Sequence, residues 1–180
     1  MDARINFVKQ WYSRSEDSLD EFERFVFLWL CMVCIAKYWY QINYGLDRNY
    51  ESPKDDGYYI ASYFKNNRNA KLAIDACSSL TEYKNLSKRK SVNNDYVIGG
   101  VPDSYELLKS LYMNSVFGQP MTTVDKSKAI GMALKSIRNN LFHGGKLYDS
   151  SEDNELLVLG APILKALVID SAKTHMELTL

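Results

Sequence analysis

A continuous apolar run occupies residues Phe25 to Ala36, which read FVFLWLCMVCIA without a polar interruption. A membrane-spanning helix needs about 20 apolar residues, so this run is too short to cross a bilayer. Arg24 and Lys37 bound the run, and acidic residues lie just upstream. We therefore expect a central helix that is buried on nearly every face, and no membrane partner.

The residues around this run predict where its helix begins and ends. Residues 18–21 read Ser-Leu-Asp-Glu, a capping box that predicts Ser18 as the N-cap, and acidic residues crowd the first turn. Gly45 offers a natural stop, so the helix is expected to run to about Tyr44. A shorter amphipathic helix, around Ala3 to Ser13, is expected before it.

Helical spacing resumes after a loop around Gly57. Apolar positions repeat at helical intervals over residues 58–64 and again over residues 72–80. The polar segment 83–94 is expected to be the least structured part of the chain. Residues 96–100 can form one extended stretch, which is too little to make a sheet.

Two further capping signatures open helices in the second half of the chain. Residues 102–106, Pro-Asp-Ser-Tyr-Glu, predict a helix that ends near Gly118. Thr122 with Asp125 predicts the start of the next helix, which should continue towards His143. Two glycines that follow this histidine are expected to end it.

The last helical stretch is expected to start near Ser151. Four apolar positions keep one face across Pro162, namely Leu156, Leu159, Ile163 and Leu167. A kinked helix, or two short helices that meet at this proline, would both satisfy the pattern. No linker or internal repeat divides the chain, so the pattern predicts one all-α domain over residues 1–180.

Composition and charge are typical of a globular domain, and they do not indicate which kind of molecule it binds. The chain has 180 residues, of which 46% are hydrophobic and 24% charged, and its formal net charge is zero. A zero net charge neither indicates nor excludes a nucleic-acid partner. Between residues 54 and 90, eight basic residues stand against four acidic ones, densest at Lys84, Lys88, Arg89 and Lys90. This stretch is either a solvated loop or a patch that contacts RNA phosphates.

The chain has three cysteines, at positions 31, 34 and 77. A low, odd count fits a reducing cytoplasm, where we expect the protein to reside. Cys31 and Cys34 have CxxC spacing, but they lie inside the most apolar helix and no second CxxC exists. We interpret them as buried thiols that act as small hydrophobic groups, and we expect neither a metal nor a cofactor.

Candidate chemistry gathers where the helix after Thr122 is expected to end. Arg138 and Asn139 lie five and four positions before His143, a spacing that brings the three residues to one patch near a helix end. Histidine can exchange a proton near neutral pH, arginine can bind phosphate oxygens, and asparagine can orient either group. The set suits cleavage of RNA by its own 2′-hydroxyl. It equally suits a helix C-cap, in which His143 and Lys146 compensate the terminal carbonyl groups.

The sequence Arg138-Asn139-x-x-x-His143 resembles the R-N-x-x-x-H signature of HEPN domains (higher eukaryotes and prokaryotes nucleotide-binding). The surrounding sequence, Ile-Arg-Asn-Asn-Leu-Phe-His-Gly-Gly-Lys, is similar to the version of the motif found in abortive-infection and other prokaryotic defence proteins of this family. The motif spans about ten residues, and the long central helix and the apolar helix after the motif fit the family's bundle.

The resemblance implies a four- to five-helix HEPN-like bundle with short accessory helices, in which Arg138 and His143 are catalytic and Asn139 is a polar helper. It also implies a homodimer that brings two motifs into one cleft. The activity it implies is metal-independent endoribonuclease cleavage that leaves a 2′,3′-cyclic phosphate. Adenylylated members of the family often have a tyrosine directly after the histidine, where this chain has Gly144, so that mode of regulation does not carry over.

Three functions follow from the sequence. The first is an RNase effector, a toxin or phage-defence protein that an antitoxin or regulatory protein would restrain, with Lys146, Lys88, Arg89 and Lys90 contacting RNA. The second is a non-catalytic HEPN module for dimerisation or for RNA or nucleotide binding. The third is a helical scaffold with a fortuitous motif. The intact Arg/Asn/His set favours the first.

Overall fold

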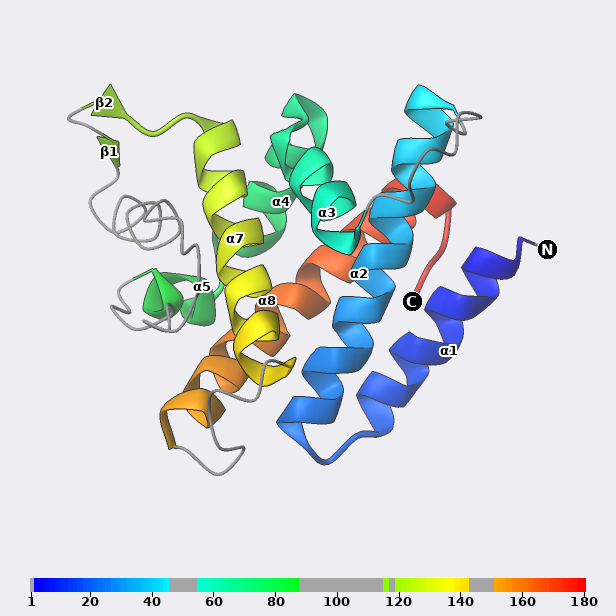
Figure 1. The fold of residues 1–180 in the computed structure, drawn as a ribbon, viewed down its shortest axis with the longest axis horizontal. Coiled ribbons are helices and arrows are strands. Elements are labelled where there is room, and N and C mark those ends of the chain that lie inside the picture. The colour runs from blue at the N-terminus through cyan, green and yellow to red at the C-terminus, as the bar shows by residue number, and fades with distance from the viewer. Residues whose placement is uncertain (1, 46–54, 88–114, 117–118, 143–150) are drawn as a thin grey trace.

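A computed structural model describes residues 2–45, 55–87, 115–116, 119–142 and 151–180 of the chain. Helices make up 85% of these residues, so the expected all-α class is confirmed (Figure 1). The elements in the described ranges are α1 (Ala3–Asp17), α2 (Glu21–Tyr44), α3 (Asp56–Lys65), α4 (Asn67–Cys77), α5 (Thr81–Leu86), β1 (Ser115–Val116), β2 (Gln119–Pro120), α7 (Thr123–Phe142) and α8 (Ser151–Met176). β1 and β2 form a short antiparallel pair.

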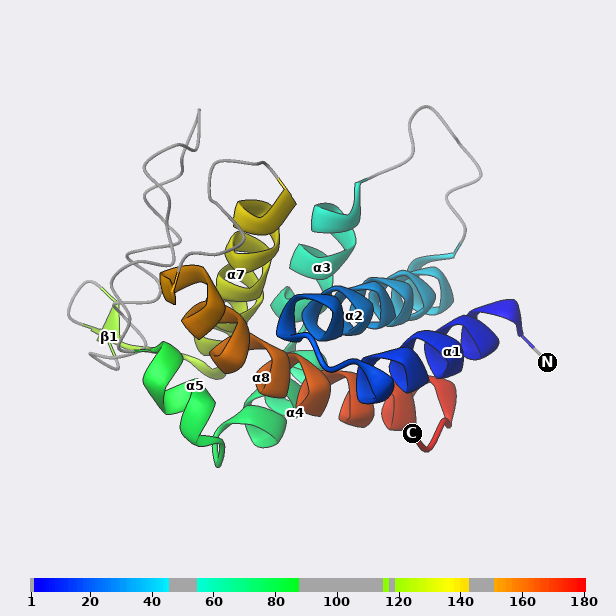
Figure 2. The ribbon, with the colours of Figure 1, turned by 90° about the horizontal axis from the view of Figure 1, so that it is seen from below.

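Helix α2 is the central element and packs against α1, α3 and α8. In Figure 1 α1 lies alongside it, and Figure 2 shows α8 crossing beneath both helices. Burial on nearly every face was expected, yet only eight of the twelve residues from Phe25 to Ala36 are buried. The others line one half-exposed side of the helix: Val26, Phe27, Leu30 and Cys34.

By length and composition, α2 is also the one helix in the described part of the chain that could cross a membrane. Half of its most apolar window is buried inside the structure. A core helix of a globular protein passes the same test, and the packing of α2 against three other helices fits that explanation.

The start of α2 differs from the expected one. Asp20, not Ser18, is the N-cap, and its carboxylate accepts hydrogen bonds from the backbone N–H groups of Phe22 (2.7 Å) and Glu23 (3.3 Å). The reason is that α1 continues to Asp17 instead of stopping near residue 13, which leaves only three residues for the connection.

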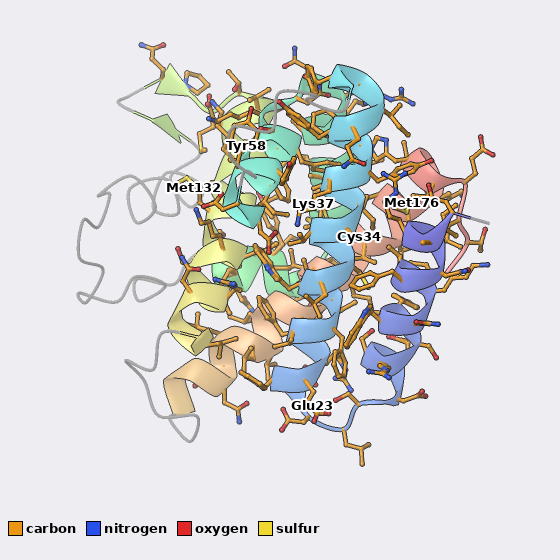
Figure 3. The ribbon with its side chains drawn as sticks, turned by 45° about the vertical axis from the view of Figure 1, so that its right-hand side comes forward. Glu23, Cys34, Lys37, Tyr58, Met132 and Met176 are labelled. Atoms are coloured by element: carbon orange, nitrogen blue, oxygen red, sulfur yellow. The ribbon has the colours of Figure 1, made fainter. Side chains whose placement is uncertain are left out.

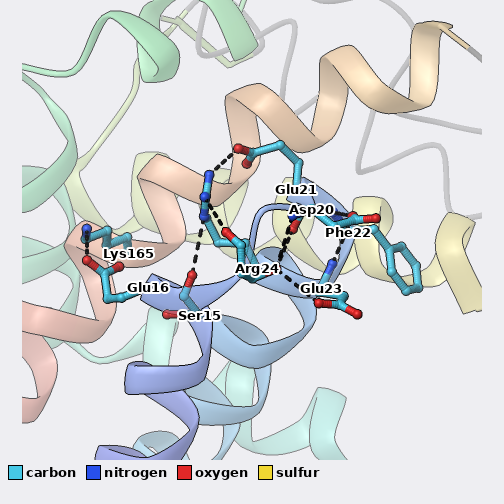
Figure 4. A network of polar contacts seen from close by, with 9 residues as sticks. Ser15, Glu16, Asp20, Glu21, Phe22, Glu23, Arg24 and Lys165 are labelled. Atoms are coloured by element: carbon cyan, nitrogen blue, oxygen red, sulfur yellow. Dashed lines mark hydrogen bonds and ion pairs between the residues drawn. The ribbon is translucent and has the colours of Figure 1, made fainter.

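A polar network holds this tight connection in place (Figure 4). The guanidinium of Arg24 donates to the backbone oxygens of Ser15 (3.4 Å) and Ser18 (2.7 Å) and pairs with Glu21. Nearby, Lys165 of α8 forms an ion pair with Glu16 of α1 at 2.7 Å. The two bonds from Arg24 to backbone oxygens satisfy carbonyl groups that the end of α1 would otherwise leave unpaired.

Other expected helix boundaries hold at Gly45, at Thr122 and at Ser151, where α8 begins. Gly45 follows α2 with a φ of 78°, a left-handed conformation that favours glycine, and its N–H donates to the oxygen of Gln41 at 3.0 Å. At the start of α7, the hydroxyl of Thr122 accepts from the N–H of Asp125 (3.1 Å) and donates to its carboxylate (2.6 Å). This reciprocal pair fixes where α7 begins.

The middle of the chain is more helical than its polarity suggests. Gly57 lies inside the first turn of α3 rather than in a loop, and Asn66 separates α3 from α4 by capping the latter. Residues 83–86 were expected to be unstructured, but they belong to α5. The strand pair β1–β2 lies near Gly118, where the helix that begins at residues 102–106 was expected to end. That helix and the extended stretch at 96–100 lie outside the described residues.

Of the two arrangements considered for the last stretch, α8 adopts a single helix that continues through Pro162. Leu156, Ile163 and Leu167, on the expected face, are all buried in the core. Because α8 packs against α2, α4, α5 and α7, it joins the elements that lie on either side of α2.

Candidate active site

Helix α7 positions the first two residues of the motif. Three of its apolar side chains, Ile130, Leu134 and Ile137, recur at helical spacing and are at most 2% exposed. Burial of this stripe fixes the rotation of the helix about its axis. Arg138 and Asn139 follow the stripe directly, so they lie at its edge, half-buried and partly open to solvent.

The two polar side chains contact each other. The guanidinium nitrogen Nη1 of Arg138 donates to the amide oxygen Oδ1 of Asn139 at 3.1 Å. Because its oxygen accepts this bond, Asn139 presents its NH2 group to the surroundings as a donor. The pair therefore combines a guanidinium with an amide NH2 group, and both kinds of donor can bind phosphate or another anion.

The structure brings these two motif residues together and describes no more of the expected site. His143 follows α7 by one residue in sequence, and it lies outside the described residues together with Lys146. The same holds for the three expected RNA-binding residues Lys88, Arg89 and Lys90.

Helix α3 lies against α7 just before the motif, and each helix has a glycine at the contact, of which Gly131 permits the close approach. A Cβ atom on Gly131 of α7 would fall 2.5 Å from the ring of Phe64, and one on Gly57 of α3 would fall 2.7 Å from Nζ of Lys135. Phe64 of α3 thus lies over Gly131 of α7, and Lys135 of α7 lies over Gly57 of α3. Lys135 is brought over the first turn of α3, one helical turn before Arg138.

The cysteines fit the role of small hydrophobic groups. Cys31 and Cys77 are buried and Cys34 is half-buried, all as free thiols. Burial raises the pKa of Cys31 to about 12, of Cys34 to about 11 and of Cys77 to about 12, which keeps the thiols protonated. Within the described ranges, no group of three or more His, Cys, Asp or Glu side chains could hold a metal ion.

A second polar group, which sequence reasoning missed, lies in the interior far from the motif. The hydroxyl of Tyr63 in α3 donates to the hydroxyl of Ser171 in α8 at 2.8 Å, and Nε2 of His175 lies 3.2 Å from the same phenol oxygen. Tyr63 and Ser171 are fully buried. These bonds tie α3 to α8, and their residues come from positions too far apart in the sequence to be paired by spacing.

Comparison with known proteins gives no relative for this chain: no protein-family model, no curated protein and no solved structure matches it.

Proposed function

We propose that this chain is a HEPN-type endoribonuclease that cleaves RNA without a metal ion. The observation that carries the proposal is the hydrogen-bonded pair of Arg138 and Asn139 at the half-exposed end of α7, with His143 four residues after Asn139. The all-helical architecture, built around α2, α7 and α8, is compatible with a HEPN-like bundle.

In this mechanism the 2′-oxygen of the substrate attacks the adjacent phosphorus, and the bond to the 5′-oxygen of the next nucleotide breaks. His143 exchanges the protons: the 2′-hydroxyl loses one and the leaving 5′-oxygen gains one. Arg138 stabilises the extra negative charge of the pentacoordinate phosphorane, and Asn139 orients a phosphate oxygen or the imidazole. The products are a 2′,3′-cyclic phosphate and a 5′-hydroxyl.

The proposal includes a homodimer. One motif supplies a single imidazole, whereas proton transfer at two oxygens uses a base and an acid. A two-fold axis near the end of α7 would bring a second motif to the same RNA strand. A toxin or defence effector of this kind, acting in the cytoplasm, would need an antitoxin or another regulatory protein to restrain it.

The first prediction tests catalysis directly. With total RNA and excess chelator, the wild-type chain should cleave, and His143→Ala should reduce the rate by about 10²- to 10⁴-fold, the loss typical of an acid/base group. Arg138→Ala should be comparably severe, because water replaces the guanidinium poorly in the transition state. A substrate with 2′-deoxy residues should resist cleavage.

Two matched controls separate chemistry from folding. Lys126→Ala removes a positive charge from the first turns of the same helix, and His175→Ala removes the other histidine of the chain. Both should keep their cleavage rate. Equal cutting of the deoxy substrate would exclude 2′-hydroxyl attack, and RNA binding without any cleavage would indicate the non-catalytic HEPN module instead.

A further inference from the structure

Helix α8 has a glycine at a buried position, Gly160, two residues before Pro162. Glycine is one of the least favourable residues in a helix interior. Its freedom to adopt a positive φ is not used here, because Gly45 is the one described glycine with a positive φ. The reason for a glycine at position 160 therefore lies in the space around it.

Two core side chains occupy the place that a side chain at position 160 would take. A Cβ atom on Gly160 would fall 3.0 Å from Cδ1 of Ile137 in α7 and 3.0 Å from Cε2 of Phe25 in α2. Favourable contacts between carbon atoms begin near about 3.5 Å, so a methyl group here would push on both side chains. Ile137 is 2% exposed and Phe25 is fully buried, which leaves neither of them free space to move into. We call the contact of these three residues the Gly160 junction.

The Gly160 junction connects three helices. Helix α8 packs against both α2 and α7, and α7 also packs against α3 and α4. In Figure 3, where Met132 marks α7, α8 passes behind α7 and α2. The junction therefore holds α7 against the two longest helices of the described structure.

The junction lies directly before the candidate active site. Ile137 is the last buried residue of α7 among those described, and the motif pair, Arg138 and Asn139, follows it in sequence. Leu141, about one turn later, is only partly buried against the core. The contact of α7 with α3 at Gly131 lies about 9 Å of helix axis before Ile137. The position of the motif pair thus depends on how Ile137 packs.

We infer that Gly160 is a positioning residue of the candidate active site, because the space that it leaves for Ile137 sets where α7 holds the motif pair. The inference rests on the proposed function, in which Arg138 stabilises the phosphorane. Catalytic groups act only within hydrogen-bond reach of the reacting atoms, and a displacement of about 1 Å by a distant substitution can lower a rate about 100-fold. Gly160 acts through Ile137 and not by contact with RNA.

The second prediction concerns the rate of RNA cleavage in chelator. Gly160→Ala should lower kcat about 10- to 100-fold and change KM less than about three-fold, because the displaced Arg138 loses an interaction made in the transition state. Adding Ile137→Val removes Cδ1, the atom that the new methyl group would meet, and should recover most of the rate. Ile137→Val alone completes the double-mutant cycle.

A matched double variant separates positioning from general repair of the core. Gly160→Ala/Phe25→Leu removes the ring atom on the α2 side of the junction but leaves Cδ1 of Ile137 in place. It should relieve part of the crowding without returning α7 to its place, so kcat should stay low. Circular dichroism should show the same helix content in all of the variants.

A second readout does not depend on cleavage. In ¹H–¹⁵N spectra of the full chain, the side-chain N–H signals of Arg138 and Asn139 report the hydrogen bond between them. Gly160→Ala should shift these signals in the wild-type background and shift them much less in the Ile137→Val background. The side-chain amide of Asn43, which donates to a backbone oxygen of α2 at 2.8 Å, is the control and should not move.

Each outcome decides something. A folded Gly160→Ala chain with unchanged kcat and unchanged motif signals overturns the inference, and so does equal recovery of kcat by Phe25→Leu and by Ile137→Val. A Gly160→Ala chain that does not fold, and that Ile137→Val does not restore, shows that Gly160 serves the core alone, which also overturns it. If the wild-type chain does not cleave RNA, the proposed function fails, and the spectra still decide whether Gly160 positions the motif pair.

Discussion

At the residue scale, the interior site around Tyr63 shows how burial sets the protonation of a histidine. Burial lowers the pKa of His175 from its ordinary 6.5 to about 4, and the positive charge of Arg68 acts in the same direction. The ring is therefore neutral at physiological pH. Because the phenol proton of Tyr63 goes to Ser171, Nε2–H of His175 donates to the phenol oxygen. Burial also raises the pKa of Tyr63, so the chain of hydroxyls stays uncharged.

The third prediction follows from this pKa. Between about pH 6.5 and 4 the unfolded chain binds a proton at His175 that the folded chain does not, so stability should be complete above pH 6.5 and fall as the pH drops to 4. Solvent screening of this half-exposed ring reduces the loss to about 1–2 kcal/mol. Urea unfolding at several pH values would measure the slope, which His175→Gln should flatten. The same slope in both proteins would contradict this origin.

At the element scale, the contact of α3 with α7 depends on the absence of a side chain at Gly131. Phe64 is 2% exposed and packs on Gly131, while Lys135 crosses Gly57. Interior packing is dense enough that a single added methyl group is felt. Gly131 therefore sets the distance between α7, which holds the motif, and α3.

The fourth prediction concerns Gly131, where we expect the usual preference of a helix for alanine over glycine to be reversed. Alanine usually stabilises a helix interior by up to about 1 kcal/mol over glycine. Gly131→Ala should instead destabilise the fold by about 1–3 kcal/mol, because its methyl group would overlap the buried ring of Phe64. Urea unfolding gives the free energy. In a Phe64→Leu background the penalty should shrink, and an identical penalty in both backgrounds would show that the ring is not the obstacle.

The helices could be predicted from the sequence wherever their signals are local. Gly45, the reciprocal cap of Thr122 and Asp125 and the apolar stripe of α8 each lie within a few residues of the boundary or face that they determine. The cap of α2 was misplaced because Ser18 and Asp20 both satisfy a capping pattern. The end of α1 at Asp17 decided between them, because it leaves only three residues for the connection to α2.

At the scale of the whole molecule, the candidate site could be predicted only in part. Arg138 and Asn139 are neighbours in sequence, so helical spacing was enough to join them. By contrast, the contact of Tyr40 in α2 with Tyr58 in α3 arises from the packing of the two helices, and no spacing within one helix predicts it. The density of tyrosines around positions 38–44 and 58–59 was the available signal.

The fifth prediction concerns assembly. If two motifs share one cleft, light scattering at assay concentration should give about 41 kDa, twice the 20.7 kDa of one chain. A disulfide or cross-linker introduced at the end of α7 should capture the pair and keep cleavage intact. A monomer that cleaves RNA at the full rate would remove the partner chain from the mechanism, and so would a dimer with its two His143 residues on opposite outer surfaces.

The packing of α2 against α8 also has a consequence for how the protein is made. The two helices are separated by 106 residues, from position 45 to position 150. At about 5–20 residues per second, a ribosome needs roughly 5–20 s to pass from one helix to the other. During that time the most apolar helix of the nascent chain has α1 and α3 beside it but not α8. Chaperones that shield apolar segments should therefore associate with ribosomes stalled between these helices and dissociate once α8 has emerged.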